Sequence, residues 1–112
     1  MDIVDVARFE KYAKNPGARF CKRVFTAYEL DYLKLKPAAS MAGLFAAKEA
    51  VAKAIGTGFR GFFPSEIEIR HDMYGAPEVV LYGKAKELAK GSKILVSISH
   101  TKTTAIAVAQ LK

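Results

Sequence analysis

The chain has 112 residues, of which 51% are hydrophobic and 26% charged; this is the size and composition of one globular domain, which we expect to span residues 1–112. It has neither the roughly 18 consecutive apolar residues of a membrane span nor the pattern of a signal peptide, and its single cysteine, Cys21, excludes an internal disulfide, so we expect a cytoplasmic protein with no membrane partner. The net charge of +7 favours an anionic partner, such as a nucleic acid, a phosphorylated small molecule or an acidic protein.

Two helices are expected in the first third of the chain. Residues 5–14 carry apolar side chains on one side and end at an Asn-Pro-Gly turn, and Asp5 is well placed to cap this helix. Thr26 and Glu29 have the spacing of a capping box, which predicts a helix over residues 26–34.

Residues 40–55 predict a longer, alanine-rich helix, which we expect Ser40 to cap and Gly56 to end. Glu49 and Lys53 lie one turn apart in it, although the helix has no broad polar face. One explanation is an ordinary ion pair on a solvated surface, which stabilises a helix by about 0.2–0.5 kcal/mol. The other is that the small neighbours let a ligand approach the carboxylate, beside a glycine-rich loop whose backbone amides could meet a phosphate.

The second half of the chain changes to the alternating pattern of strands. A glycine- and aromatic-rich break over residues 56–63 is interpreted as a functional loop. The elements expected after it are strands at 66–70 and 77–82, a helix at 84–90, and a hairpin of strands at 94–99 and 104–110. Helices followed by strands predict an α+β fold with an antiparallel sheet and packed helices.

Two further residues are candidates for a site around Glu49. A half-buried carboxylate there needs a cation, either Lys53 or Mg²⁺, and Mg²⁺ takes one or two carboxylates together with substrate phosphates. Asp2 is the candidate second ligand, because it precedes an apolar pair and, unlike Asp5, has no capping role to explain it. His100 lies among hydroxyls and a lysine at the expected hairpin tip and could grip an anion, although a lone histidine in a turn is more often structural.

Four sequence motifs together resemble holo-[acyl-carrier-protein] synthase, the small 4′-phosphopantetheinyl transferase of bacteria. They are "DIV" (2–4), "FAAKEAVAKAIGTG" (45–58), "IEI" with "YGAPEV" (67–69 and 74–79) and "SISHTK" (97–102), in the family's order and spacing. The resemblance implies the 4′-phosphopantetheinyl transferase fold and a homotrimer, with sheets assembled around the trimer axis and active sites between subunits. It also implies Mg²⁺-dependent transfer of 4′-phosphopantetheine from coenzyme A to a serine of apo acyl carrier protein, which releases adenosine 3′,5′-bisphosphate and activates fatty acid synthesis.

The same resemblance implies roles for residues of this chain. Asp2 and Glu49 match the Mg²⁺ ligands and, with Lys53, the catalytic residues; Lys53 also matches a lysine that contacts a coenzyme A phosphate. The loop beside the nucleotide is matched by Gly56, Thr57 and Gly58. Two residues near the coenzyme A phosphates are matched by His100 and Thr101. The region that docks the acidic carrier protein is matched by Arg8, Arg19 and Phe20. The serine proton needs a base, for which Glu49 and a metal-bound water are both candidates.

Two alternatives to this function stay open at this point. The net charge and the interleaved phenylalanines and arginines at 19–25 and 59–63 are compatible with a nucleic-acid-binding module. Against it, the basic residues form no stripe and such a module has no use for Glu49, so we expect no nucleic-acid partner. The second alternative is an inactive trimeric relative, because Leu44 stands where members of the family often have an arginine, which removes one phosphate contact.

Overall fold

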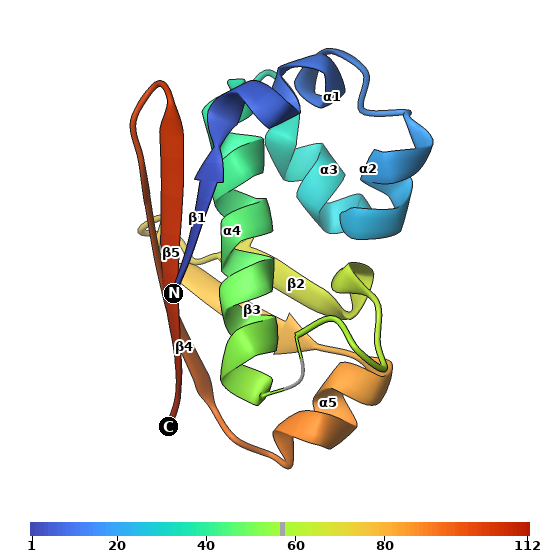
Figure 1. Cartoon of the computed structure of the whole chain (residues 1–112), viewed down its shortest axis with the longest axis vertical. Coiled ribbons are helices and arrows are strands. Elements are labelled where there is room, and N and C mark those ends of the chain that lie inside the picture. The colour runs from blue at the N-terminus through green and yellow to red at the C-terminus, as the bar shows by residue number, and fades with distance from the viewer. Residues whose placement is uncertain (57) are drawn as a thin grey trace.

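The structure is a computed structural model that describes residues 1–56 and 58–112. Its centre is the long helix α4 (Ala38–Ile55), which packs against a three-stranded sheet and a two-stranded sheet (Figure 1). Both sheets are antiparallel, as predicted, and the α+β class is confirmed. The first has the order β1 (Asp2–Asp5), β5 (Thr104–Leu111), β4 (Ile94–His100), and the second pairs β2 (Ile67–His71) with β3 (Pro77–Leu81).

The predicted C-terminal end of α4 is confirmed, whereas its predicted N-terminal end is not. The helix begins at Ala38, directly after Pro37, so the expectation that Ser40 caps it is wrong. Alanine is the strongest helix former, and the two alanines after the proline extend the helix toward its N-terminus. The other end is as predicted, because Gly56 takes a left-handed conformation with φ of +103° and closes the last turn.

Small side chains bring α4 close to the three-stranded sheet. Ala105 and Ala107 on β5 are buried, and so are Ala46, Ala47 and Ala50 on the helix. Because neither surface carries bulk at these positions, side chains from the edge strand β1 can reach residues on α4.

The segment at 5–14 differs from the single helix expected there. β1 leads into a 3-10 helix, η1 (Val6–Phe9), and only then does α1 (Glu10–Lys14) begin. Asp5 pairs with Thr104 of β5, and its side chain caps no helix, so the capping role expected for it is wrong. The reason is tertiary, because pairing with the last strand holds the start of the chain extended.

Two short helices, α2 (Arg19–Val24) and α3 (Ala27–Leu33), complete the N-terminal half (Figure 1). Nothing in the sequence pattern predicts α2, whose apolar stretch is too short to show a period. The capping box of α3 is confirmed: Thr26 Oγ1 accepts the Glu29 N–H at 3.2 Å, and Glu29 Oε1 accepts the Thr26 N–H at 2.9 Å.

The second half follows the expected order, with α5 (Gly83–Ala89) between β3 and β4. A 3-10 turn that the sequence did not predict, η2 (Pro64–Glu66), comes before β2. The β4–β5 hairpin is confirmed, and His100 lies opposite Ala105 in it. None of the helices in the described part of the chain is both long and apolar enough to cross a bilayer.

Candidate functional site

Two carboxylates and an amine gather where the start of β1 meets the second half of α4. Lys53 Nζ lies 2.8 Å from Asp2 Oδ1 and 3.3 Å from the carbonyl oxygen of Met1. Asp2 is only 9% exposed, Glu49 is half-buried, and Lys53 is exposed. The register explains the meeting, because Asp2 pairs with the buried Ala107 on the face of the sheet that α4 covers.

This arrangement differs from the surface ion pair considered for Glu49 and Lys53. Asp2 is the carboxylate that pairs with Lys53, and among the described residues Glu49 has no ion-pair partner within 4 Å. Burial and then the Asp2 carboxylate raise the pKa of Glu49, while Lys53 and Arg8 oppose the rise. The hydrogen bond to Asp2 raises the pKa of Lys53. The cluster therefore holds two carboxylates within electrostatic reach of each other and one ammonium group.

The second oxygen of Asp2 tests whether this cluster suits a metal ion. Asp2 Oδ2 is buried and makes no hydrogen bond within the described structure. A buried acceptor without a partner is rare, and here it lies beside a second carboxylate. Carboxylate oxygens of this kind are the ligands that Mg²⁺ takes, so Asp2 and Glu49 fit this ion. No third carboxylate, imidazole or thiol of the described residues gathers with them.

The glycine-rich turn lies directly after the Lys53 end of α4. Gly58 has a φ of +59°, and its amide donates to the carbonyl oxygen of Ala52 at 3.1 Å. At Gly56 and Gly58 an added Cβ would meet open space, so it is the positive φ that favours glycine at both. Thr57, the third residue expected in this loop, lies outside the described residues.

His100 lies in a different part of the chain from the two carboxylates. It ends β4 and, with Gly43, Leu44 and His71, lines a cavity of about 240 Å³. Gly43 precedes Glu49 by six positions, which is about 9 Å along a helix. A single copy of the chain therefore does not bring His100 together with the carboxylate cluster. Thr101 is exposed, and its Oγ1 accepts the Thr103 and Thr104 amides within the hairpin turn.

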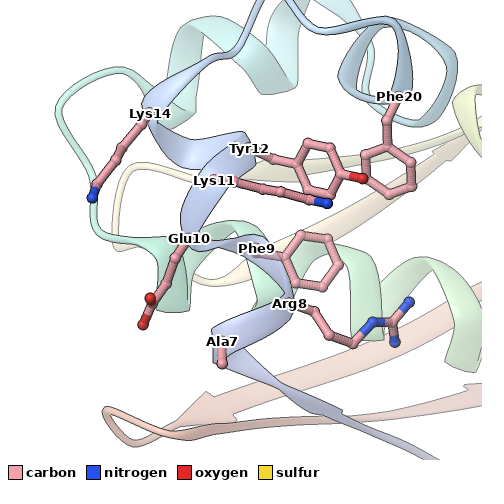
Figure 2. Close-up of a pocket in the computed structure, with 8 residues that line it drawn as sticks. All are labelled: Ala7, Arg8, Phe9, Glu10, Lys11, Tyr12, Lys14 and Phe20. Atoms are coloured by element: carbon pink, nitrogen blue, oxygen red, sulfur yellow. The ribbon is translucent and has the colours of Figure 1, made fainter.

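Arg8 and Phe20 do come together, at a cavity of about 640 Å³ along η1 and α1. The Phe20 ring stacks on Tyr12 at a centroid distance of 4.3 Å, and the Arg8 guanidinium carbon lies 5.5 Å from the centre of the Phe45 ring. In Figure 2, Arg8 and Lys11 extend toward the side on which the Tyr12 and Phe20 rings lie, whereas Glu10 and Lys14 point away from it. Arg19 is exposed on α2 and does not line this cavity.

Three features of the structure escaped the sequence analysis. Lys11 joins Arg8 at the aromatic cavity, which a helical wheel of η1 and α1 could have indicated. His71 shares the cavity of His100 and stacks on Tyr32 at 4.2 Å, and its Nδ1 is buried without a hydrogen-bond partner in the described structure. Lys48, next to Glu49, is fully buried, and its spacing with Leu44 and Val51 on one face of the helical wheel could have indicated this.

Comparison with known proteins gives a consistent result over nearly the whole chain. Residues 1–109 match the family model described as the 4′-phosphopantetheinyl transferase superfamily. A holo-[acyl-carrier-protein] synthase from Caldanaerobacter subterraneus is 50% identical, over 96% of this chain and 88% of the relative. The fold matches the crystal structure of the Helicobacter pylori holo-[acyl-carrier-protein] synthase in complex with coenzyme A, with a TM-score of 0.87 and 33% identity over 99% and 96% of the two chains. A Bacillus anthracis holo-(acyl-carrier-protein) synthase in complex with CoA (3′,5′-ADP) matches with a TM-score of 0.80 and 34% identity over 98% and 90% of the chains.

Proposed function

The chain belongs to the 4′-phosphopantetheinyl transferase superfamily, among the holo-[acyl-carrier-protein] synthases, and from this premise we propose its reaction and its site. A serine hydroxyl of an apo acyl carrier protein attacks the pantetheine-side phosphorus of coenzyme A. The new bond joins the serine oxygen to phosphorus, and the bond from phosphorus to the bridging oxygen breaks. Adenosine 3′,5′-bisphosphate leaves with that oxygen and the electron pair, while the serine proton passes to a base.

The observation that carries the proposal is the cluster of Asp2, Glu49 and Lys53 with its unpartnered Asp2 Oδ2. Asp2 and Glu49 are the residues that would hold Mg²⁺, which supplies positive charge to the pyrophosphate and to the leaving bisphosphate. Asp2 is held in place by the β1–β5 ladder and Glu49 by α4, so both carboxylates are fixed by regular structure rather than by loops.

Lys53 and the turn after it are suited to the phosphates of coenzyme A. Its ammonium group is exposed and donates to Asp2 and to the carbonyl oxygen of Met1, so its third N–H donor is left for a phosphate. Gly56 and Gly58 lack a side chain on the next turn, where we place the nucleotide together with Thr57. The amides of both glycines already donate to carbonyl oxygens of α4, so their contribution is the open space that a missing side chain leaves for the nucleotide.

The aromatic cavity of Arg8 and Phe20 is the surface that we assign to the carrier protein. Arg8 and Lys11 offer charges to an acidic helix, and the Tyr12 and Phe20 rings offer it an apolar surface. Arg19, exposed on the next helix, extends the positive charge. The net charge of +7 favours rapid encounter with an acidic protein by electrostatic steering.

We also propose that the active site is completed by a second copy of the chain in a homotrimer. The outer face of the three-stranded sheet exposes Ile3 at 67%, Val108 at 48% and Leu95 at 44%. Exposed apolar side chains gathered on one face are typical of an association surface. A neighbouring copy can then bring His100 and Thr101 to the carboxylates from which they are separated within one chain.

The decisive experiment is transfer itself. The protein is incubated with apo acyl carrier protein, coenzyme A and Mg²⁺, and the intact mass of the carrier is measured. We expect one phosphopantetheine group to be added, and none to be added in excess EDTA. The control is a second phosphopantetheinyl transferase that modifies the same carrier preparation. If that control works and our protein leaves the mass of the carrier unchanged, the proposed reaction is refuted and the chain is an inactive relative.

A further inference from the structure

Lys48 lies beside Glu49 in the sequence but faces the other way, into the core. Its side chain has no solvent exposure, which is unusual for lysine. Its Nζ lies 2.7 Å from Glu29 Oε1, and it also donates to the carbonyl oxygens of Pro64, at 3.1 Å, and Ile67. An ammonium group has three N–H donors, so every donor of Lys48 is used within the protein.

Glu29 also has no solvent exposure, and both of its carboxylate oxygens have partners. Besides Lys48, its carboxylate accepts the backbone amide of Thr26 at 2.9 Å and that of Ile69 at 2.7 Å. The pair therefore joins α3, α4 and β2. Burial raises the pKa of Glu29 and lowers that of Lys48, while each charge favours the ionised form of the other.

Stability alone does not account for such a pair. Two buried charges lose their hydration, and apolar side chains of similar size often stabilise a core equally well. An apolar residue cannot, however, donate to the two backbone carbonyls that Lys48 holds in place. Those carbonyls lie at the two ends of η2, directly after residues 58–63.

Residues 58–63 are fixed at both ends. At the first end, the Gly58 amide bonds to α4. At the second, Glu66 of η2 accepts the Phe63 amide at 2.9 Å, and Lys48 holds η2 from inside the core. Between these ends the segment exposes Arg60 and packs Phe62 into the core. Because Lys48 holds η2 in place, it also determines the path that residues 58–63 take from the end of α4.

We propose that Lys48 is a positioning residue for coenzyme A: through the carbonyls of Pro64 and Ile67 it holds residues 58–63 in the conformation that receives the nucleotide. The inference rests on the proposed function, which places the nucleotide at the turn after α4. One helix then serves two purposes, because Glu49 faces the carboxylate cluster and the adjacent Lys48 secures the far end of the loop.

Three variants separate positioning from stability. Lys48→Met removes the donors and leaves Glu29 as an unpaired buried charge. Glu29→Gln keeps the Lys48 donors to the two carbonyls and is the matched control. The double variant, Glu29→Gln with Lys48→Met, removes both charges, so its urea midpoint should lie above that of Lys48→Met, and it serves as the main test if Lys48→Met does not fold.

The measurements are coenzyme A affinity by calorimetry without carrier protein, KM for each substrate, and hydrogen exchange of residues 58–63. For the double variant we expect a Kd for coenzyme A about tenfold above wild type, equivalent to about 1.4 kcal/mol, with KM for the carrier protein unchanged. Exchange of the 58–63 amides should become faster in both variants that lack Lys48, and stay close to wild type in Glu29→Gln.

Two results with these variants overturn the inference. One is a double variant with wild-type coenzyme A affinity and wild-type exchange in residues 58–63. The other is a Glu29→Gln variant that loses coenzyme A affinity as much as the double variant, since Lys48 keeps its carbonyl bonds there. Failure of the proposed function looks different, because the wild-type protein itself would then bind no coenzyme A; that result overturns the role of Lys48 toward coenzyme A as well.

Discussion

Glu49→Gln is the substitution with the sharpest consequences for the proposed site, because it removes one charge and changes almost no volume. Glu49 is half-buried and lies within electrostatic reach of Asp2, whose carboxylate raises its pKa. Without metal, removal of a like charge should raise the free energy of unfolding by about 0.5 kcal/mol, the scale of one unfavourable neighbouring pair. For a chain of 112 residues this raises Tm by about 2 °C.

Mg²⁺ should reverse the order of the Tm values, so that wild type becomes more stable than Glu49→Gln. At a concentration one hundred times its Kd, an ion that binds only the folded state stabilises it by about 2.7 kcal/mol, or about 10 °C in Tm. Wild type should gain a shift of this order and Glu49→Gln much less, because one of its two ligands has lost its charge. The rate of transfer should fall by about 100-fold or more, the usual cost of one lost electrostatic contact in a transition state.

The assay combines thermal unfolding, in EDTA and in Mg²⁺, with the intact mass of the carrier protein over time. Asp5→Asn is the matched control, because Asp5 is an exposed carboxylate on the same strand. It should leave both the Mg²⁺ shift and the transfer rate unchanged. The metal assignment is wrong if Glu49→Gln transfers at the wild-type rate or keeps the full Mg²⁺ shift.

Three further substitutions test other parts of the proposal. Val108→Asp places a charge on the apolar outer face of the sheet, so sedimentation should show smaller particles, and an unchanged mass would refute that face as the interface. Arg8→Glu should raise KM for the carrier protein about tenfold or more and leave KM for coenzyme A alone, whereas a rise in both would contradict a docking role. Glu66→Gln tests a pH effect, because the amides of Phe63, Ala85 and Lys84 lower the pKa of this carboxyl. A carboxyl with a lowered pKa stabilises the folded state at pH values above its unfolded pKa, near 4.3, and this stabilisation is lost as acid protonates it. The difference in free energy of unfolding between wild type and Glu66→Gln, measured in urea, should therefore shrink below about pH 4. A difference that stays constant with pH would refute this explanation.

Local signals predicted the parts of the fold that depend on neighbouring residues. The capping box at Thr26, the end of α4 at Gly56 and the β4–β5 hairpin all depend on residues close together in sequence. The roles expected for Asp5 and Ser40 failed for the opposite reason. Asp5 is extended because it pairs with a strand from the other end of the chain, and α4 starts earlier because two alanines follow Pro37.

The sequence indicates which residues belong to the candidate site but not which of them contact one another. Nothing in the spacing of Glu49 and Lys53 indicates that the lysine pairs with Asp2, because that contact depends on how β1 lies against α4. Lys48 is the clearest limit. Its spacing with Leu44 and Val51 places it on the apolar face of the helix, but nothing local indicates that Glu29, from another helix, pairs with it there.

The order of strands in the three-stranded sheet has a consequence for how the protein matures on the ribosome. β1, which carries Asp2, pairs with β5 and with no other strand of the described structure, and β5 comes last in chain order among the described strands. At about 5–20 residues per second, the nascent chain therefore exposes β1 for several seconds before its partner exists. The alanine-rich helix α4 is long enough to begin forming during that interval, whereas the carboxylate cluster can assemble only after β5 has emerged. Any truncation that removes β5 should thus leave β1 unpaired and prone to aggregation, and should uncover the face of α4 that β5 covers.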